Sequence, residues 1–227
     1  MKTAIVTGGS RGIGRVTALE LLKEGYTVII TSRNNKELKE TEKELKKYGK
    51  IIGIKSDVSN YDDIKDLIKE IYNKYKQIDV LVNNAGVALW KELDNMNKKE
   101  IDDILDTNLK GLIYMCREVV PIMKKQKSGK IINISSGAGK QGYASFAVYC
   151  ASKFGVIGLS ESLAKELEEY GISVYTICPS GVNTKMYLDM EPDVDPNSLL
   201  QPEEIAEKIM EFIKGKHRNG ACIEVYK

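Results

Sequence analysis

The sequence contains little of what metal sites and most acid–base sites use. Of its 227 residues only one is histidine, His217, and it lies in a polar stretch near the end. The four cysteines, at positions 116, 150, 178 and 222, lie far apart without a C-x-x-C pair, which argues against a zinc knuckle or a disulfide framework. We therefore predict no metal site, and any proton transfer must use other side chains.

The sequence also lacks an excess of one charge and a long apolar run. It has 34 Lys and Arg against 32 Asp and Glu, so its net charge of +2 favours neither nucleic acid nor an anionic membrane. No stretch approaches the ~20 apolar residues of a membrane span. The first expected strand begins at residue 3, which leaves no room for a signal peptide. These features predict a cytoplasmic protein with no nucleic-acid or membrane partner.

What the chain does contain is a regular alternation of strand and helix patterns. Short apolar runs predict strands over 4–7, 27–31, 51–54, 78–82, 130–135, 173–177 and 221–225. Helical spacing of apolar residues follows the first strand and recurs over 35–48, 61–75, 98–125, 149–170 and 203–214. This alternation predicts an α/β fold, a doubly wound parallel sheet of about seven strands with helices on both faces. The length fits one domain over 1–227.

The first expected strand runs directly into a glycine-rich turn. Residues 3–14 read TAIVTGGSRGIG, and a helical pattern begins just after them. Glycines let the backbone approach a ligand closely, and a helix N-terminus directs unpaired N–H groups toward a phosphate. The stretch therefore predicts a nucleotide site of the Rossmann type, or else a tight turn without a ligand. Its candidate residues are Gly8, Ser10, Arg11, Gly12, Ile13 and Gly14.

Arginines near the end of the second expected strand bear on the choice of cofactor. In a doubly wound fold this end faces the adenosine ribose, where a carboxylate favours the free 2′-hydroxyl and an arginine accommodates a 2′-phosphate. The positions hold Ser32 and Arg33, and Arg11 adds a second guanidinium from the glycine turn. The pattern predicts NADP(H) in preference to NAD(H), unless both arginines are merely solvated.

Two further motifs follow later strands. The stretch NNAG at 83–86 ends the fourth strand. Tyr149 follows Ser136 by thirteen residues, and Lys153 lies one helical turn after Tyr149. With the order TGxxxGxG over 7–14, these motifs resemble the short-chain dehydrogenase/reductase family, over almost the whole chain. The resemblance implies an oxidoreductase that transfers a hydride between NADP(H) and a carbonyl or alcohol substrate.

The resemblance also implies roles for individual residues. It assigns Asn108, Ser136, Tyr149 and Lys153 to catalysis, with Asn108 holding a helix kink and a water that links Lys153 to solvent. It assigns to the cofactor Asp57 and Val58 (adenine), Asn84, Ala85 and Gly86 (nicotinamide riboside), Tyr149 and Lys153, and Pro179, Ser180, Val182 and Thr184 (nicotinamide amide). Without the resemblance, Asp57 would be interpreted as a turn or cap residue before the helix at 61–75. The last turn departs from the family pattern, since Ser180 stands where glycine is usual and Gly181 follows it.

The side chains at 136, 149 and 153 suit acid–base chemistry without histidine. A free tyrosine titrates near pH ~10, and a nearby ammonium favours the phenolate and lowers that pKa. Tyr149 would then donate the proton in reduction and accept it in oxidation, while the Ser136 hydroxyl stabilises charge on the substrate oxygen. The adjacent Ser135 competes for the serine role, and the family spacing selects Ser136.

Substrate choice depends on the loops near 88–96, 138–148 and 185–201. Their larger side chains, Trp90, Tyr143, Phe146, Met186 and Tyr187, predict a pocket for a partly apolar small-molecule carbonyl compound. Residues 185–201 are expected to form a lid over it. In relatives the helices corresponding to 98–125 and 149–170 pair subunits, so the resemblance implies a homodimer or homotetramer.

Several functions remain open from the sequence. Within the family these are a 3-oxoacyl carrier-protein reductase and a ketone, sugar or pterin reductase; the short tail and the Pro-Ser-Gly turn count against the first. A non-catalytic NADP(H)-binding regulator would lack a catalytic residue, yet all four are present. A nucleotide-sugar epimerase or dehydratase would require a larger C-terminal region.

Overall fold

The fold is built on a seven-stranded sheet, which the computed structural model describes together with its helices for residues 2–215 and 217–227. The strands are β1 (Thr3–Thr7), β2 (Thr27–Ser32), β3 (Ile51–Lys55), β4 (Val80–Asn83), β5 (Gly129–Ile134), β6 (Ile172–Pro179) and β7 (Cys222–Val225). Their order is β3-β2-β1-β4-β5-β6-β7, and every neighbouring pair is parallel. This confirms the predicted doubly wound sheet of seven strands.

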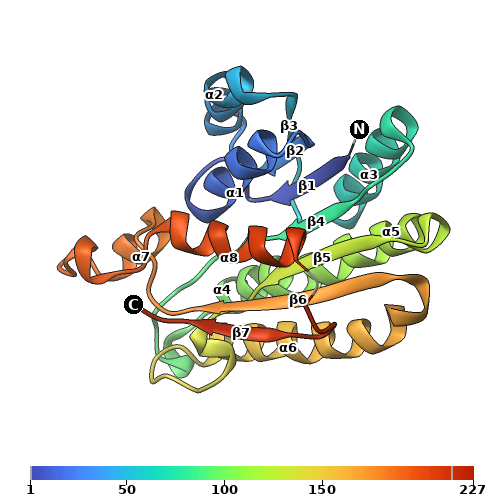
Figure 1. The fold of residues 1–227 in the computed structure, drawn as a ribbon. Helices are drawn as coiled ribbons and strands as arrows, with labels where there is room; N and C mark the ends of the chain where they lie inside the picture. Colours follow the sequence, from blue (N-terminus) through green and yellow to red (C-terminus); the bar gives the residue numbers. More distant parts are fainter. Residues whose placement is uncertain (1, 216) are drawn as a thin grey trace.

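Helices cover both faces of the sheet (Figure 1). One face carries α1 (Gly12–Lys23), α2 (Asn35–Leu45) and α8 (Pro202–Lys214), and the other carries α3 (Tyr61–Tyr75), α5 (Gly111–Gln126) and α6 (Ala147–Leu167). The helix α4 (Lys98–Leu105) packs against α6, and the short α7 (Lys185–Met190) follows β6. The core is accordingly two apolar layers, one on each side of the sheet.

The central strand shows why this sheet is buried on both sides. All five residues of β1 are buried; Ala4 and Val6 belong to the layer under α1 and α8, whereas Ile5 belongs to the layer under α3 and α5. Successive side chains of a strand point to opposite faces, so a continuous apolar run supplies both layers.

Two of the differences from the predicted element boundaries have a clear physical cause. The fourth strand begins at Val80 and not at residue 78, because Gln126 takes both backbone groups of Ile78 and the carboxylate of Asp79 accepts from the Thr3 amide at 2.6 Å. The helical region predicted over 98–125 is divided by one π-helical turn, Asp106–Lys110, around Asn108. That turn is the break expected there.

The carboxyl ends of the strands meet along one edge of the sheet. The strand order reverses between β1 and β4, which makes the crevice between their ends the place where such folds bind ligands. None of the described helices is both long enough and apolar enough to span a membrane.

Candidate active site

A cleft of about 980 Å³ opens over this carboxyl edge. Segments from six of the strand ends and from α7 line it. Of the predicted site residues, all but three line the cleft; the three are Gly14, Asp57 and Asn108. The fold therefore brings together motifs that are up to 176 positions apart in the chain, from Gly8 to Thr184.

The glycine turn after β1 has the backbone geometry that an anion site needs. Gly12 opens α1 with φ +52°, in the left-handed region that side chains rarely adopt, and it lines the cleft. The first turn of α1 contains no acidic residue. Its free N–H groups and positive dipole end thus face the cleft without a competing carboxylate on the helix itself.

Gly14 contributes to the turn by packing and does not line the cleft. A Cβ at this position would lie 2.5 Å from Asn84 Nδ2 and 2.5 Å from the Gly8 carbonyl oxygen. The Asn84 amide reaches this point because Nδ2 donates to the carbonyl oxygens of Thr7 at 2.9 Å and Gly8 at 3.1 Å. The glycine turn and the NNAG turn are therefore one interlocked unit.

Thr7 completes this unit, and the sequence analysis did not assign it a role. Its Oγ1 accepts from the backbone amides of Asn84 and Ala85, both at 3.0 Å. A threonine that directly precedes the glycine turn, at the end of a buried strand, is the signal that could have identified it.

The end of β2 forms a charged corner of the cleft. Arg11 and Arg33 are exposed there, and the Ser10 hydroxyl lies 3.1 Å from Ser32 Oγ. The carboxylate of Glu37, in the first turn of α2, lies 3.4 Å from Ser10 Oγ and 3.9 Å from Arg11 Nη1. This glutamate was not predicted, because position 37 falls in a segment whose charges resemble a solvated helix face.

Beyond β3, the residues expected near an adenine ring divide into two groups. Val58 lines the cleft, and so does Ser56, whose buried hydroxyl has no hydrogen-bond partner among the described residues. Asp57 instead accepts from Ser59 N at 2.9 Å and Ser59 Oγ at 2.7 Å. Its carboxylate thus occupies the turn before α3, which was the alternative interpretation of this residue.

Three side chains with acid–base capacity meet at the centre of the cleft. Tyr149 and Lys153 extend from the first turns of α6, and Lys153 Nζ lies 5.5 Å from the centre of the Tyr149 ring. Lys153 is 5 % exposed and donates from Nζ to the Ile134 carbonyl at 3.0 Å. Ser136 lies near enough to Tyr149 for its hydroxyl to act on the pKa of the phenol. Ser135 turns away, donating from Oγ to the Lys153 carbonyl at 2.9 Å.

Burial dominates the electrostatics of this group. It raises the pKa of the Tyr149 phenol to about 12, against the hydrogen bond with Ser136, even though the ring is partly exposed to the cleft. Burial also lowers the pKa of the Lys153 ammonium to about 8. The expectation that Lys153 lowers the pKa of Tyr149 is therefore not met in the ligand-free chain, where the cost of burying each charge exceeds their mutual attraction.

Asn108 lies behind the cleft and joins two of its walls. In the π-helical turn its Oδ1 accepts from Val87 N at 2.8 Å, and its Nδ2 donates to Val87 O at 2.8 Å and to Ser152 Oγ at 3.2 Å. Ser152 in turn donates to the Tyr149 carbonyl at 2.7 Å. Asn108 thus holds the loop after β4 against the helix that bears Tyr149 and Lys153.

The turn after β6, which departs from the family pattern, packs against residues 185–201. A Cβ at Gly181 would lie 2.9 Å from Leu199 Cδ2 and 2.9 Å from Tyr187 Cζ, so these two side chains would have to shift to admit one. Thr184 lines the cleft near Gly12, while its Oγ1 lies 3.4 Å from the Tyr187 amide at the start of α7.

Aromatic rings form the wall next to Tyr149. Phe146 stacks on Tyr149 with ring centres 4.3 Å apart, and Trp90 stacks on Phe146 at 4.9 Å. Tyr143, Met186 and Tyr187 also line the cleft, as predicted for the substrate loops. The wall accommodates apolar groups beside a phenol that can exchange a proton.

Residues 2–195 match the family model described as short chain dehydrogenase. The chain belongs to this family. It is 40% identical over 202 residues to the 3-oxoacyl-[acyl-carrier-protein] reductase of Staphylococcus epidermidis, a match that covers 88% of this chain and 83% of that protein. It is 36% identical over 190 residues to the NADPH-dependent pterin aldehyde reductase of Arabidopsis thaliana, covering 82% of this chain and 76% of that one.

Two solved structures superpose closely on this chain and share its fold. A variant of actinorhodin polyketide ketoreductase with NADPH superposes with a TM-score of 0.92 at 30% identity, covering 99% of this chain and 95% of that chain. Levodione reductase, at 23% identity, superposes with a TM-score of 0.93 over 99% of this chain and 96% of its own, which bears on the fold alone.

Proposed function

We propose that this short-chain dehydrogenase is an NADP(H)-dependent carbonyl reductase in which Tyr149 is the proton donor. The observation that carries the proposal is the meeting of Tyr149, Lys153 and Ser136 in the same cleft as the glycine turn. The names of relatives at 36% and 40% identity support both carbonyl reduction and the phosphorylated cofactor.

The cleft fits a dinucleotide at several points. A phosphate-binding turn lies at Gly8–Ile13, a guanidinium corner for a 2′-phosphate at Arg11 and Arg33, and an unpartnered buried hydroxyl at Ser56. We assign Val58, Asn84, Ala85, Gly86, Pro179, Ser180, Val182 and Thr184 to the same ligand; Gly14 supports the turn from behind. The role of Asp57 at the adenine stays a prediction.

Each catalytic side chain has one task in this proposal. The bound dinucleotide supplies the hydride. The Tyr149 phenol gives its proton to the substrate oxygen in reduction and takes it back in oxidation, and Ser136 Oγ donates a hydrogen bond to that oxygen. Lys153 holds positive charge beside the phenol, which favours the phenolate left behind. Asn108 is a positioning residue, because it acts through Val87 and Ser152.

The substrate side of the proposal follows from the lining. The stacked rings of Trp90 and Phe146 favour a partly apolar small-molecule carbonyl compound. Residues 185–201, which pack on Gly181 and extend over the cleft as α7, are proposed as a lid. Within this class 3-oxoacyl thioesters and pterin aldehydes are the first compounds to examine, because relatives are named for them.

The test measures oxidation of NADPH against a panel of 3-oxoacyl thioesters, aromatic and pterin aldehydes, and simple ketones. We expect turnover of at least one class and slower turnover with NADH. NADPH binding without turnover of any carbonyl compound would favour the non-catalytic regulator instead. Binding of neither dinucleotide would overturn the proposal as a whole.

We also propose a homodimer or homotetramer that pairs α4, α5 and α6. Phe154 on α6 is 47% exposed, which is unusual for a phenylalanine and supports a face that another subunit covers. Light scattering after gel filtration should give a dimer or tetramer mass, and Phe154→Lys should shift it toward the monomer. The cytoplasmic location stays a prediction.

A further inference from the structure

Two cysteines on neighbouring strands lie side by side at the edge of the sheet. Cys178 of β6 and Cys222 of β7 have their Sγ atoms 3.6 Å apart, within hydrogen-bond distance for sulfur. The register pairs Thr176 with Cys222 and Cys178 with Glu224, so the two cysteines are offset by two residues and point to the same face. The proposed reduction uses neither thiol.

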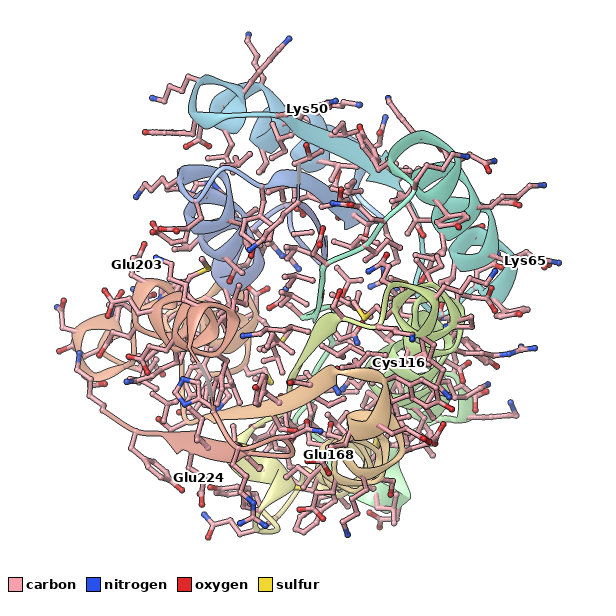
Figure 2. The ribbon with its side chains drawn as sticks, turned by 45° about the vertical axis from the view of Figure 1, so that its right-hand side comes forward. Lys50, Lys65, Cys116, Glu168, Glu203 and Glu224 are labelled. Carbon is pink, nitrogen blue, oxygen red and sulfur yellow. The ribbon has the colours of Figure 1, made fainter. Side chains whose placement is uncertain are left out.

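The two thiols differ in access. Cys178 is fully buried, whereas Cys222 is partly exposed. Cys222 begins β7, an edge strand that pairs only with β6. Figure 2 shows Glu224, two residues further on, at this outer edge, far from Cys116 in the layer around α5. A reagent in solution therefore reaches Cys222 first, and the strand that carries it is free to shift on one side.

The groups around the two thiols also shift their pKa values in opposite directions. Hydrogen bonds from Cys178 and then from Lys140 lower the pKa of the Cys222 thiol to about 6, against burial and the Glu161 carboxylate. The hydrogen bond to Cys222 and burial raise the pKa of Cys178, while Lys140 and Ser135 oppose the rise. Glu224 also acts on Lys140. Cys222 is thus the thiol that ionises more readily, and Cys178 stabilises its thiolate.

We propose that Cys178 and Cys222 are a redox-active dithiol, which a low-molecular-weight disulfide oxidises to an intramolecular disulfide between β6 and β7. The Cys222 thiolate attacks one sulfur of the small disulfide, breaks its S–S bond and releases one thiolate. Cys178 then loses its proton and attacks the Cys222 sulfur, which releases the second. Two protein thiols are oxidised, and one small disulfide is reduced to two thiols.

The geometry requires only a modest movement for this bond. A disulfide bond is ~2.05 Å long, so the sulfurs must approach by about 1.5 Å from their present separation. A disulfide also requires Cα atoms within ~6.8 Å of each other. Because the two cysteines are offset by two residues, the edge strand must be displaced as well as the side chains rotated. Because Cys178 is fixed in the interior of the sheet between β5 and β7, the displacement falls on β7.

Formation of the disulfide would affect the cleft through two contacts. Ser180, which lines the cleft, donates from its backbone N to the Val225 carbonyl of β7 at 2.9 Å. Lys140 directly follows the turn Gly137–Gly139 after Ser136. Movement of β7 and loss of the thiolate partner of Lys140 therefore shift both turns. We expect oxidation to raise the KM for NADPH several-fold, and dithiothreitol to reverse the change. Only this measurement rests on the proposed function.

The primary test follows mass and not activity. The full chain is incubated with glutathione disulfide, and its intact mass and non-reduced peptides are measured. We expect a loss of two hydrogens and a peptide that links Cys178 to Cys222. Cys178→Ser should stop at the mixed disulfide on Cys222, Cys222→Ser should remain unmodified at both positions, and the matched control Cys116→Ser should form the disulfide as the wild type does.

Two outcomes overturn the proposal. One is a stable mixed glutathione disulfide on wild-type Cys222, which would mean that Cys178 cannot reach it. The other is no reaction of the native chain with glutathione disulfide. A disulfide that leaves the KM unchanged supports the modification and removes its coupling to the cleft. Absence of reductase activity in the reduced chain would instead count against the proposed function, because the mass measurement does not depend on it.

Discussion

Glu37 is the perturbation with the clearest expected effect on cofactor choice. Its carboxylate lies 3.9 Å from Arg11 Nη1, at the corner proposed for the 2′-phosphate of NADPH. Arg11 therefore already has an anionic partner, and a phosphate placed there would face a second negative charge. Glu37→Gln removes that charge while keeping the length of the side chain and its capacity to accept from Ser10.

The size of the effect follows from distance and exposure. The two side chains are 54% and 36% exposed, so water screens them, and unit charges at 3.9 Å then interact by about 1 kcal/mol. Releasing Arg11 for the phosphate should tighten NADPH binding by about fivefold. The Kd for NADH, which lacks the 2′-phosphate, should change by less than about twofold.

Titration of dinucleotide fluorescence with wild type, Glu37→Gln and Glu40→Gln measures this directly. Glu40 is the matched control, since it lies on the same helix, is exposed and does not line the cleft. Equal tightening of NADPH by both variants would mean that only net charge matters. Weaker NADPH binding by Glu37→Gln would refute the reasoning, because the carboxylate would then be helping to hold the cofactor.

Three further variants test other parts of the site. Arg33→Ala should weaken NADPH by about tenfold and NADH little, since it loses a charge-assisted bond to the 2′-phosphate; an unchanged ratio of the two Kd values would exclude Arg33 from cofactor choice. Asn108→Ala should lower the free energy of unfolding in urea by about 2–4 kcal/mol, because it breaks three hydrogen bonds, to Val87 and Ser152; a change under about 0.5 kcal/mol would show that they contribute little. Lys153→Met should abolish turnover yet raise stability at pH 7. The pKa of Lys153 is lowered to about 8, so the buried ammonium destabilises the fold fully below pH 8, and this cost disappears as the pH rises to the unfolded value of 10.5. The stability advantage of the variant over wild type should shrink over the same interval, and an advantage that grew with pH would contradict this sign.

Much of the fold could be predicted because local signals and the global topology agree. The β1 residues Ala4–Val6 are apolar, as the centre of a strand buried on both faces must be, and the turn after it contains the glycines that its close packing needs. The break at Asn108, which is a π-helical turn in the structure, was expected from the family resemblance. Features that depend on residues close together in the chain could therefore be predicted from the sequence.

Contacts that depend on the packing of distant segments could not be predicted from the sequence. The Glu37 carboxylate enters the cleft because α2 begins close to Ser10, 27 positions earlier in the chain. The approach of Cys178 to Cys222 depends on the register of two strands, β6 and β7, that are separated by 42 residues in the sequence. The raised pKa of Tyr149 reflects burial, which no spacing of residues reveals.

The central claim is that the Tyr149 phenol supplies the proton to the substrate oxygen, and Tyr149→Phe tests it most directly. The ring and its stack on Phe146 remain in this variant, and only the hydroxyl is removed. For the best carbonyl substrate, kcat should fall by about 1,000-fold, while the Kd for NADPH stays within about twofold of wild type. A variant that turns over at the wild-type rate would contradict the claim.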